Sequence, residues 1–184
     1  MKTNRISKLM LAAVLSVAGL AAATPDVKAA PDQVLAQKVA HEVRMYSRYT
    51  IWDNVKVRVN DGNVELEGQV SQPFKRADLQ RLAQRTPGVT SVTNRLEVLP
   101  TSFYDDELRI RVARAIYRDA TLSRYAIQAV PPIHIIVNNG HVTLEGVVNS
   151  QMEKTVAGIR ASSAGLSLGQ VVNNLRVENA SRKG

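Results

Sequence analysis

Two short stretches of the chain alternate hydrophobic with polar residues, and a glycine turn interrupts each stretch. In the first, the apolar positions on either side of Asp61-Gly62 are Val55, Val57, Val59, Val64 and Leu66. This alternation indicates half-buried strands, and Asp-Gly is a favoured two-residue hairpin turn. The turn predicts a register in which Val59 faces Val64, Arg58 faces Glu65 and Lys56 faces Glu67. One face of the hairpin is then apolar, and the other carries two pairs of opposite charges.

The same pattern occurs a second time along the chain. Residues 59–70, which end in Val-x-Leu-x-Gly-x-Val, recur as residues 137–148 around the turn Asn139-Gly140. The four-residue spacing of Leu35, Val39 and Val43 recurs upstream of the second hairpin in Leu108, Val112 and Ile116. Downstream, residues 92–98 recur as residues 171–177. Two copies indicate tandem domains rather than a solenoid, which needs more repeats.

Each copy combines helical and strand periodicity in the same order. Apolar residues at helical spacing predict helices over 33–47 and 74–85 in the first copy and over 106–119 and 151–161 in the second. The expected fold class is α+β: two tandem αββαβ modules, each a three-stranded mixed sheet with two helices on one face. We place the modules at residues 32–99 and 104–178, and a flexible tail at 179–184.

The first 29 residues differ from the rest. Lys2, Arg5 and Lys8 precede an apolar stretch from Leu9 to Ala23, and the sequence at Val27-Lys28-Ala29 is similar to a cleavage site. This pattern is typical of a Sec-type signal peptide, and the apolar stretch is shorter than the roughly 20 residues that a membrane-spanning helix needs. We therefore expect an exported, periplasmic protein that is cleaved after Ala29 or after Ala23.

Export changes the charge of the chain. The full sequence has 24 Lys and Arg against 16 Asp and Glu; removing residues 1–29 takes away four bases and one acid, which leaves 20 against 15 and a net charge of +5. Such an excess tolerates an anionic partner without requiring one. The chain has no cysteine, so we expect neither a disulfide nor attachment of a lipid, and the protein is not expected to be a lipoprotein.

The repeated residues resemble the BON domain family (bacterial OsmY and nodulation). The first mark, V-x-L-x-G-x-V, spans Val64–Val70 and Val142–Val148, and the second, G-V-x-x-V-x-N-x-L, spans Gly88–Leu96. In the second copy this second mark is looser, because two extra residues separate Gly165-Leu166 from Val171. The resemblance implies a dual-BON periplasmic protein that binds phospholipid or another envelope component without catalysis and supports envelope integrity. The missing cysteine separates the chain from the lipoprotein members of that family.

No set of residues has the spacing of a catalytic site, so we expect no enzyme and no cofactor. The histidines are His41, His134 and His141, with His134 expected opposite Glu145. A metal site needs three or four converging ligands, so these are interpreted as surface histidines and not as metal ligands. Neither glycine-rich phosphate motif occurs, and no nucleic-acid recognition motif is present, so no nucleic-acid partner is expected.

Four arginines of the second module suggest a partner. Arg111, Arg114 and Arg118 follow at helical spacings of three and four on the flank away from the apolar face, and Arg124 lies just beyond that helix. Basic residues are attracted to anionic lipid headgroups by ~1 kcal/mol each near a charged surface. The alternative is a solvated helix face. The leading interpretation is an anionic phospholipid or other envelope surface, bound through this region.

The outward faces of the two hairpins differ. In the second hairpin this face carries His134, Ile136, Thr143 and Glu145, joined by Val172 from the third strand. An apolar outward patch on one sheet only suggests a cover, which is the first module, a second copy of the chain or a protein partner. The alternative function is therefore a protein-interaction or chaperone-like module that uses the outer sheet face formed by His134, Ile136, Thr143 and Val172.

Aromatic and aliphatic residues also precede the first hairpin. Tyr49, Ile51 and Trp52 stand at places that match Tyr125, Ile127 and Val130 before the second hairpin. We interpret them as residues that pack in the core or between the domains. An interfacial lipid anchor, a common use of Trp and Tyr, is the alternative.

Overall fold

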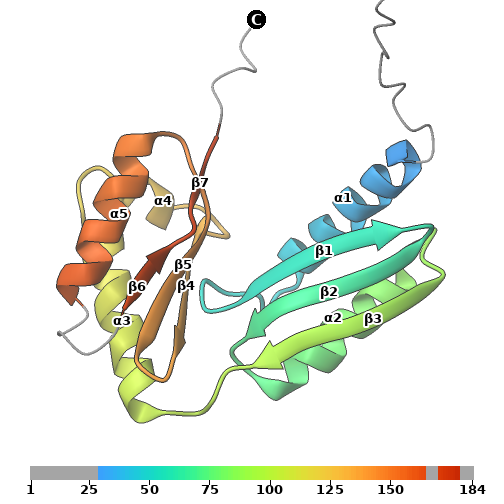
Figure 1. Ribbon diagram of the computed structural model, residues 1–184, viewed down its shortest axis with the longest axis horizontal. Helices are drawn as coiled ribbons and strands as arrows, with labels where there is room; N and C mark the ends of the chain where they lie inside the picture. Colours follow the sequence, from blue (N-terminus) through green and yellow to red (C-terminus); the bar gives the residue numbers. More distant parts are fainter. Residues whose placement is uncertain (1–28, 165–169, 179–184) are drawn as a thin grey trace, which may run out of the picture.

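The computed structural model describes residues 29–164 and 170–178, which form two modules of the same design (Figure 1). The first contains α1 (Ala29–Met45), β1 (Asn54–Asn60), β2 (Asn63–Val70), α2 (Pro73–Arg85) and β3 (Ser91–Val98). The second contains α3 (Phe103–Tyr117), α4 (Ser123–Ala126), β4 (Ile133–Asn138), β5 (His141–Val148), α5 (Gln151–Ala164), β6 (Val171–Asn173) and β7 (Arg176–Val177). The α+β class and the repeated αββαβ order are confirmed. The expected signal peptide, apart from Ala29, and the expected tail at 179–184 lie outside the described residues.

Both sheets are mixed, as predicted. In the first, β2 lies between β1, to which it is antiparallel, and β3, to which it is parallel. The predicted hairpin register is confirmed, with Val59 opposite Val64 and Arg58 opposite Glu65. In the second sheet, β5 lies between β4 and an interrupted third strand, because β6 and β7 both pair with β5 in parallel. Figure 1 shows α1 and α2 on one face of the first sheet and α3 and α5 on one face of the second.

A separate hydrophobic core lies between the helices and the sheet of each module. The first core consists of Leu35, Val39, Val43, Val64, Leu66, Val70, Leu79, Ala83 and Leu96. In the second core, Leu108, Val112 and Ile116 of α3 occupy the places of the first three. The four-residue spacing that predicted both helices therefore marks their buried faces. The short helix α4 was not predicted, and it contributes Tyr125 to the second core.

A carboxylate at the start of each module's first helix holds the hairpin turn. Asp32 accepts hydrogen bonds from both backbone N–H groups of the Asp61-Gly62 turn, at 2.8 and 3.2 Å. Asp105 does the same for the Asn139-Gly140 turn, at 2.9 and 2.8 Å. Both residues of each turn have positive φ, between 50° and 79°, which matches the right-handed twist of a hairpin. Each turn is thus fastened to the helix that packs beneath its sheet.

The opposite charges on the outer face of the first sheet stand opposite each other across the hairpin as predicted, but their ion pairs form with other partners. Arg58 pairs diagonally with Glu67, and Arg95 of β3 pairs with Glu65 at 2.9 Å. Twisted strands bring diagonal neighbours within reach of long side chains, and β3 adds a cation that the hairpin alone does not contain. Exposed pairs of this kind contribute only ~0–1 kcal/mol each to stability.

Candidate functional site

The two long helices of the second module form a groove with an excess of arginine. α3 and α5 pack against each other, and the described residues lining the groove between them are Arg114, Ala115, Arg118, Asp119, Ala120, Arg160 and Ser163. Arg114 and Arg118 are exposed, and among the described residues neither guanidinium pairs with an acid. The groove therefore presents three guanidinium groups against the single carboxylate of Asp119.

Asp119 orients one of these arginines. Its Oδ2 accepts a hydrogen bond from Arg160 Nε at 2.7 Å, and its Oδ1 accepts one from the backbone N–H of Thr121 at 2.8 Å. The Thr121 backbone and the Arg160 guanidinium hold the pKa of Asp119 below its usual value. The carboxylate stays ionised and fixes Arg160 at the groove, and the other guanidinium nitrogens of Arg160 have no partner among residues 29–164 and 170–178. Arg160 lies on a different helix from the other arginines, so the spacing along α3 could not point to it.

The four arginines named from the sequence do not all lie together. Arg114 and Arg118 line the groove, whereas Arg111 is half-buried, and its Nε and Nη2 atoms are shielded from water without a hydrogen-bond partner in the described part of the chain. Arg124 lies on α4, pairs with Glu153, and stands 5.1 Å from the centre of the Tyr125 ring. The structure thus brings two of the four to the groove, together with Arg160.

Apolar side chains are exposed on the same two helices. Phe103 and Ile110 of α3 are 83 % and 45 % exposed, and Ile159 of α5 is 60 % exposed. Ile110 precedes Arg114 by one helical turn and therefore lies on the same side of α3, and Ile159 directly precedes Arg160 in the sequence of α5. The helical face of the second module therefore combines cations with exposed apolar side chains.

A buried ion pair lies at the start of α2 in the first module. Lys75 Nζ is 2.6 Å from Asp53 Oδ2, and both side chains are almost completely buried. Asp53 also accepts hydrogen bonds from the backbone and hydroxyl groups of Thr50 and Ser71, at 2.7 to 2.9 Å. Burial by itself raises the pKa of Asp53, but the hydrogen bonds from Lys75, Ser71 and Thr50 outweigh it and leave the pKa below its usual value. This network fixes the loop before β1.

The equivalent position of α5 carries the opposite charge. Glu153, like Lys75 the third residue of its helix, accepts hydrogen bonds from the Tyr125 hydroxyl at 2.8 Å and from two backbone N–H groups at the helix start, at 2.9 and 3.1 Å. Burial raises the pKa of Glu153, whereas these bonds and Arg124 lower it more, so the carboxyl stays ionised. Both buried charges are fully engaged in holding the fold, and neither is placed for acid–base chemistry.

The loop before β1 docks on the second module. The backbone oxygen of Ile51 accepts a hydrogen bond from the backbone N–H of Ile135 at 2.7 Å, and the side chains of Ile51 and Trp52 pack against the second core. The Tyr49 ring lies 5.4 Å from the His134 ring. Lys56 of β1 also pairs with Glu145 of β5 at 3.4 Å. The interpretation of Tyr49, Ile51 and Trp52 as packing residues therefore agrees with their contacts. Of the matching residues, Tyr125 lies in the second core, whereas Ile127 is 88 % exposed, so the packing interpretation was wrong for Ile127.

The first module supplies the cover that the sequence left open for the outer face of the second sheet. Ile136 is only 4 % exposed, and Thr143 is half-buried, whereas Val172 is 40 % exposed and lies outside the covered area. The patch formed by His134, Ile136, Thr143 and Val172 is thus divided between a contact within the chain and one exposed edge residue.

His134 is not a surface histidine, so this expectation was wrong. Its Nδ1 atom is buried and has no hydrogen-bond partner among the residues that the structure describes. Burial lowers the pKa of His134, and this effect outweighs the nearby backbone oxygens of Asp53 and Thr50, which favour the protonated ring. The docked ring is therefore neutral at pH 7.

Comparison with known proteins assigns the repeat. The BON domain family matches residues 31–100 and residues 105–179, which together cover most of the chain. The chain belongs to the BON domain family. BON domains are phospholipid-binding, envelope-associated modules, and the proteins that carry them are typically periplasmic or envelope-associated.

Two other similarities accompany this match. An uncharacterized protein encoded in the gshII 5′ region of Anaplasma centrale is 28 % identical over 136 residues, which cover 72 % of this chain and 87 % of that protein. The structure of CdsD, a structural protein of the type III secretion system of Chlamydia trachomatis, shares 11 % identity over 80 % of this chain and 95 % of that chain. Its TM-score is 0.28, which is too low to support an argument about this protein.

The signature residues of the two BON domains have structural roles. Gly68 and Gly146 have φ of 119° and 122°, and a Cβ atom at either would stand only 2.1 or 1.9 Å from the backbone oxygen of Asn54 or Pro132. Asn94 and Asn173 each donate from Nδ2 to a backbone oxygen of the second helix, at 2.8 and 2.7 Å. The glycine lets the hairpin strands approach, and the asparagine ties the third strand to the helix. The family marks therefore describe the scaffold and not a ligand site.

Within the described part of the chain, no group of three or more His, Asp or Glu side chains is placed to hold a metal ion. No helix in residues 29–164 or 170–178 is long and apolar enough to cross a membrane.

Proposed function

We propose that this protein is a non-enzymatic binding protein of the cell envelope, and that it binds anionic phospholipid headgroups in the α3–α5 groove of its second BON domain. The observation that carries the proposal is the charge of that groove, where Arg114, Arg118 and Arg160 outnumber Asp119. A guanidinium group can donate two parallel hydrogen bonds to the oxygens of one phosphate. Arginine therefore suits a phosphodiester better than lysine, whose ammonium acts as a point charge.

The exposed apolar residues support a membrane surface as the source of these headgroups. A peripheral protein gains affinity when apolar side chains enter the boundary between headgroups and acyl chains beside its cations. Ile110, Ile159 and Phe103 are exposed on the two helices that form the groove. We propose that they contact the lipid shallowly while the arginines hold the phosphates.

Export and a contribution to envelope integrity belong to the same proposal. Residues 1–29 have the composition of a signal peptide, which would place the protein in the periplasm next to such membranes. The protein-interaction alternative receives less support, because Ile136, the central apolar residue of its patch, is covered by the first domain.

Sedimentation with vesicles tests the proposal. Vesicles of phosphatidylglycerol in phosphatidylcholine should pull down the chain lacking residues 1–29, whereas phosphatidylcholine alone should not. Since each cation contributes ~1 kcal/mol near an anionic surface, Arg114→Glu with Arg118→Glu should weaken binding by about thirtyfold or more. Arg44→Glu with Arg176→Glu makes the same change of charge at exposed sites away from the groove and serves as the matched control.

Two results would contradict the proposal. One is equal binding to neutral and anionic vesicles, and the other is an equal loss in the groove variant and in the control variant. Binding should also weaken as the salt concentration rises from about 50 to about 300 mM, because salt screens exposed charges.

A further inference from the structure

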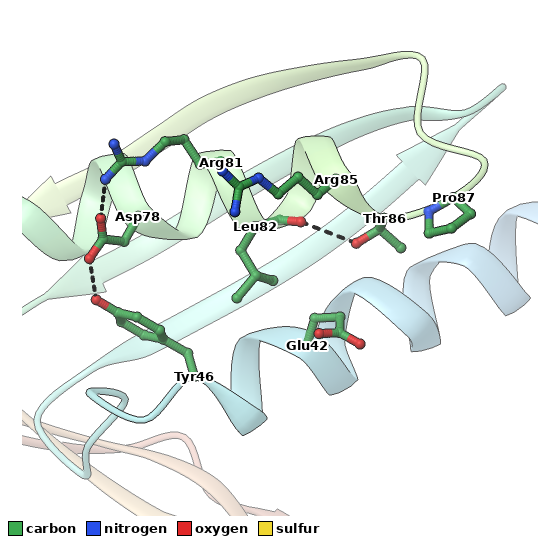
Figure 2. A pocket seen from close by; sticks show the side chains of 8 residues that line it. All are labelled: Glu42, Tyr46, Asp78, Arg81, Leu82, Arg85, Thr86 and Pro87. Atoms are coloured by element: carbon green, nitrogen blue, oxygen red, sulfur yellow. Dashed lines mark hydrogen bonds and ion pairs between the residues drawn. The ribbon is translucent and has the colours of Figure 1, made fainter.

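The first BON domain has a groove at the equivalent place, between α1 and α2, and its chemistry is different. The described residues that line it are Glu42, Tyr46, Asp78, Arg81, Leu82, Arg85, Thr86 and Pro87, and it has a volume of about 590 Å³ (Figure 2). In the repeat, Glu42 and Tyr46 correspond to Ala115 and Asp119, and Leu82 corresponds to Arg160. The groove therefore recurs in both domains, but here acidic and basic side chains are balanced.

One wall of this groove is fixed. The Tyr46 hydroxyl donates a hydrogen bond to Asp78 Oδ2 at 2.5 Å, and Asp78 Oδ1 accepts one from Arg81 (Figure 2). Burial and the neighbouring Asp78 raise the pKa of Tyr46 to about 12, and the bonds from Tyr46 and Arg81 hold the pKa of Asp78 below its usual value. These three residues satisfy one another, so they shape the groove without offering a free charge.

Two other charges of the groove are unpaired. Glu42 on α1 and Arg85 on α2 are both exposed, and neither side chain has a hydrogen bond or an ion pair with any residue in 29–164 or 170–178. Figure 2 shows them on the two helices that border the groove, with the Leu82 side chain between these helices. A carboxylate that accepts N–H bonds and a guanidinium that donates them thus flank one apolar floor.

We propose that this groove binds a small zwitterion with a primary ammonium and a phosphate, the chemistry of phosphoethanolamine. Arg85 would bind the phosphate through its paired donors, and Glu42 would accept hydrogen bonds from the ammonium. A quaternary ammonium has no N–H to donate and is usually held by a cage of several aromatic rings, whereas Tyr46 is the single aromatic residue among the described lining residues. The volume lies within the range of roughly 300–1,000 Å³ that small-molecule sites have.

This inference goes beyond the anionic-lipid function, since it concerns another domain and a ligand that carries an ammonium beside its phosphate. The same chemistry has two sources: free phosphoethanolamine, or the headgroup of phosphatidylethanolamine in a bilayer. The lipid headgroup is attached to acyl chains in a bilayer, whereas the free compound is dissolved in water, so one experiment with two arms can distinguish them.

The test uses the chain without residues 1–29 and follows its amide resonances while free phosphoethanolamine, or phosphocholine, is added. Phosphoethanolamine should shift resonances of α1 and α2 around Glu42 and Arg85, and phosphocholine should bind about tenfold more weakly or worse. Glu42→Gln and Arg85→Gln should each weaken binding by about tenfold, because each loses a charge-assisted contact. Both residues are exposed, so the variants should fold; Glu97→Gln and Arg44→Gln, also at exposed sites, are the matched controls.

A second arm identifies the source. Phosphatidylcholine vesicles with and without phosphatidylethanolamine are compared by sedimentation; a gain with phosphatidylethanolamine that Glu42→Gln abolishes assigns a lipid headgroup, and binding of the free compound alone assigns a soluble zwitterion. Absence of binding in both arms, equal binding of phosphocholine, or unchanged binding in both groove variants overturns the inference. The anionic-lipid function is judged separately, because Arg114→Glu with Arg118→Glu leaves this groove intact.

Discussion

The backbone oxygen of Ile51 accepts a hydrogen bond from the backbone N–H of Ile135, and this bond joins the loop of one BON domain to the edge strand of the other. An unpaired strand edge invites association with other chains. Here the loop of the first domain occupies part of the β4 edge at Ile135, and the neighbouring Ile136 is 4 % exposed and faces Asn54 and Lys56 of the first domain across one hollow. The loop that contains Ile51 therefore shields part of the β4 edge from pairing with another chain.

Shortening Trp52 should destabilise the second domain, although the residue belongs to the first. Its side chain packs against the second core, so Trp52→Ala should lower the free energy of unfolding of that domain by about 2–4 kcal/mol. Urea unfolding followed by circular dichroism gives the loss. Ile127→Ala changes a side chain that is almost fully exposed and should cost less than about 0.5 kcal/mol. Equal effects of the two substitutions would contradict the packing role.

Contact between the domains should weaken as the pH falls below neutrality. His134 is neutral when docked because burial lowers its pKa, so the undocked state binds more protons once the pH falls below the ordinary histidine pKa of about 6.5. The contribution of the neutral ring to the free energy of docking is thus fully present above that pH. It is lost progressively as the pH falls toward the lower pKa of the docked ring. The titratable groups that face the ring are Tyr49, Asp53 and Glu145.

Fluorescence of Trp52, the only tryptophan of the chain, measures this effect between pH 7.5 and pH 5. Hydrogen exchange at the Ile135 amide should accelerate over the same range. His134→Gln should remove most of the pH dependence, and His41→Gln, at an exposed position, should leave it unchanged. A pH response that persists in the His134 variant would show that another group is responsible.

Breaking the buried pair of Asp53 and Lys75 should be costly. Lys75→Met leaves the Asp53 carboxylate buried without its cation, which destabilises proteins by about 3–5 kcal/mol. The pKa of Asp53 is lowered in the folded state, so its contribution is present above about pH 4 and disappears as the pH falls through the folded value. Unfolding by urea at pH 7 and pH 3 checks both statements: the wild type and Lys75→Met should differ less at pH 3.

The signature glycines should tolerate no side chain. A Cβ at Gly146 would stand 1.9 Å from a backbone oxygen, so Gly146→Ala should disrupt the second hairpin, at a cost on the order of 3 kcal/mol or more. Gly68→Ala should do the same in the first domain. Heteronuclear spectra would show loss of native resonances in one domain at a time. Gln69→Ala, next to Gly68, is the control and should leave the spectrum largely intact.

Several features of the fold follow from local sequence. The Asp61-Gly62 turn and the strand alternation predict the register, and the repeat transfers it to the second hairpin, because turn geometry and burial of one face leave no other alignment. The helix ends differ by a few residues, and α1 begins at Ala29 rather than at residue 33. Elements whose geometry depends on their own residues, such as the hairpins, can therefore be predicted from the local sequence.

The buried charges were not predicted from the sequence, and most of them leave no signal in local patterns. Arg109 lies on the core side of α3 and donates from Nη2 to the backbone oxygen of Val137 at 2.8 Å, yet its charge marks it as a surface residue in the sequence. The helical spacing of Asp105, Arg109 and Ile116 contained the signal. For Asp53 and Lys75 no local signal existed, since the partner stands in another element. The same holds for Arg160, which joins Arg114 and Arg118 only through the packing of two helices.

The opposite charges of Lys75 and Glu153 have a consequence for how a duplicated protein folds correctly. Tandem copies of one sequence are prone to exchange equivalent segments during folding. If α5 packed on the first sheet, it would bring Glu153 to Asp53 and bury two carboxylates with no lysine between them. The reverse exchange would remove the carboxylate that Arg124 and Tyr125 bind. Each domain thus buries a charge whose partners exist only in that domain. This mismatch disfavours the exchange of equivalent helices between the domains during folding.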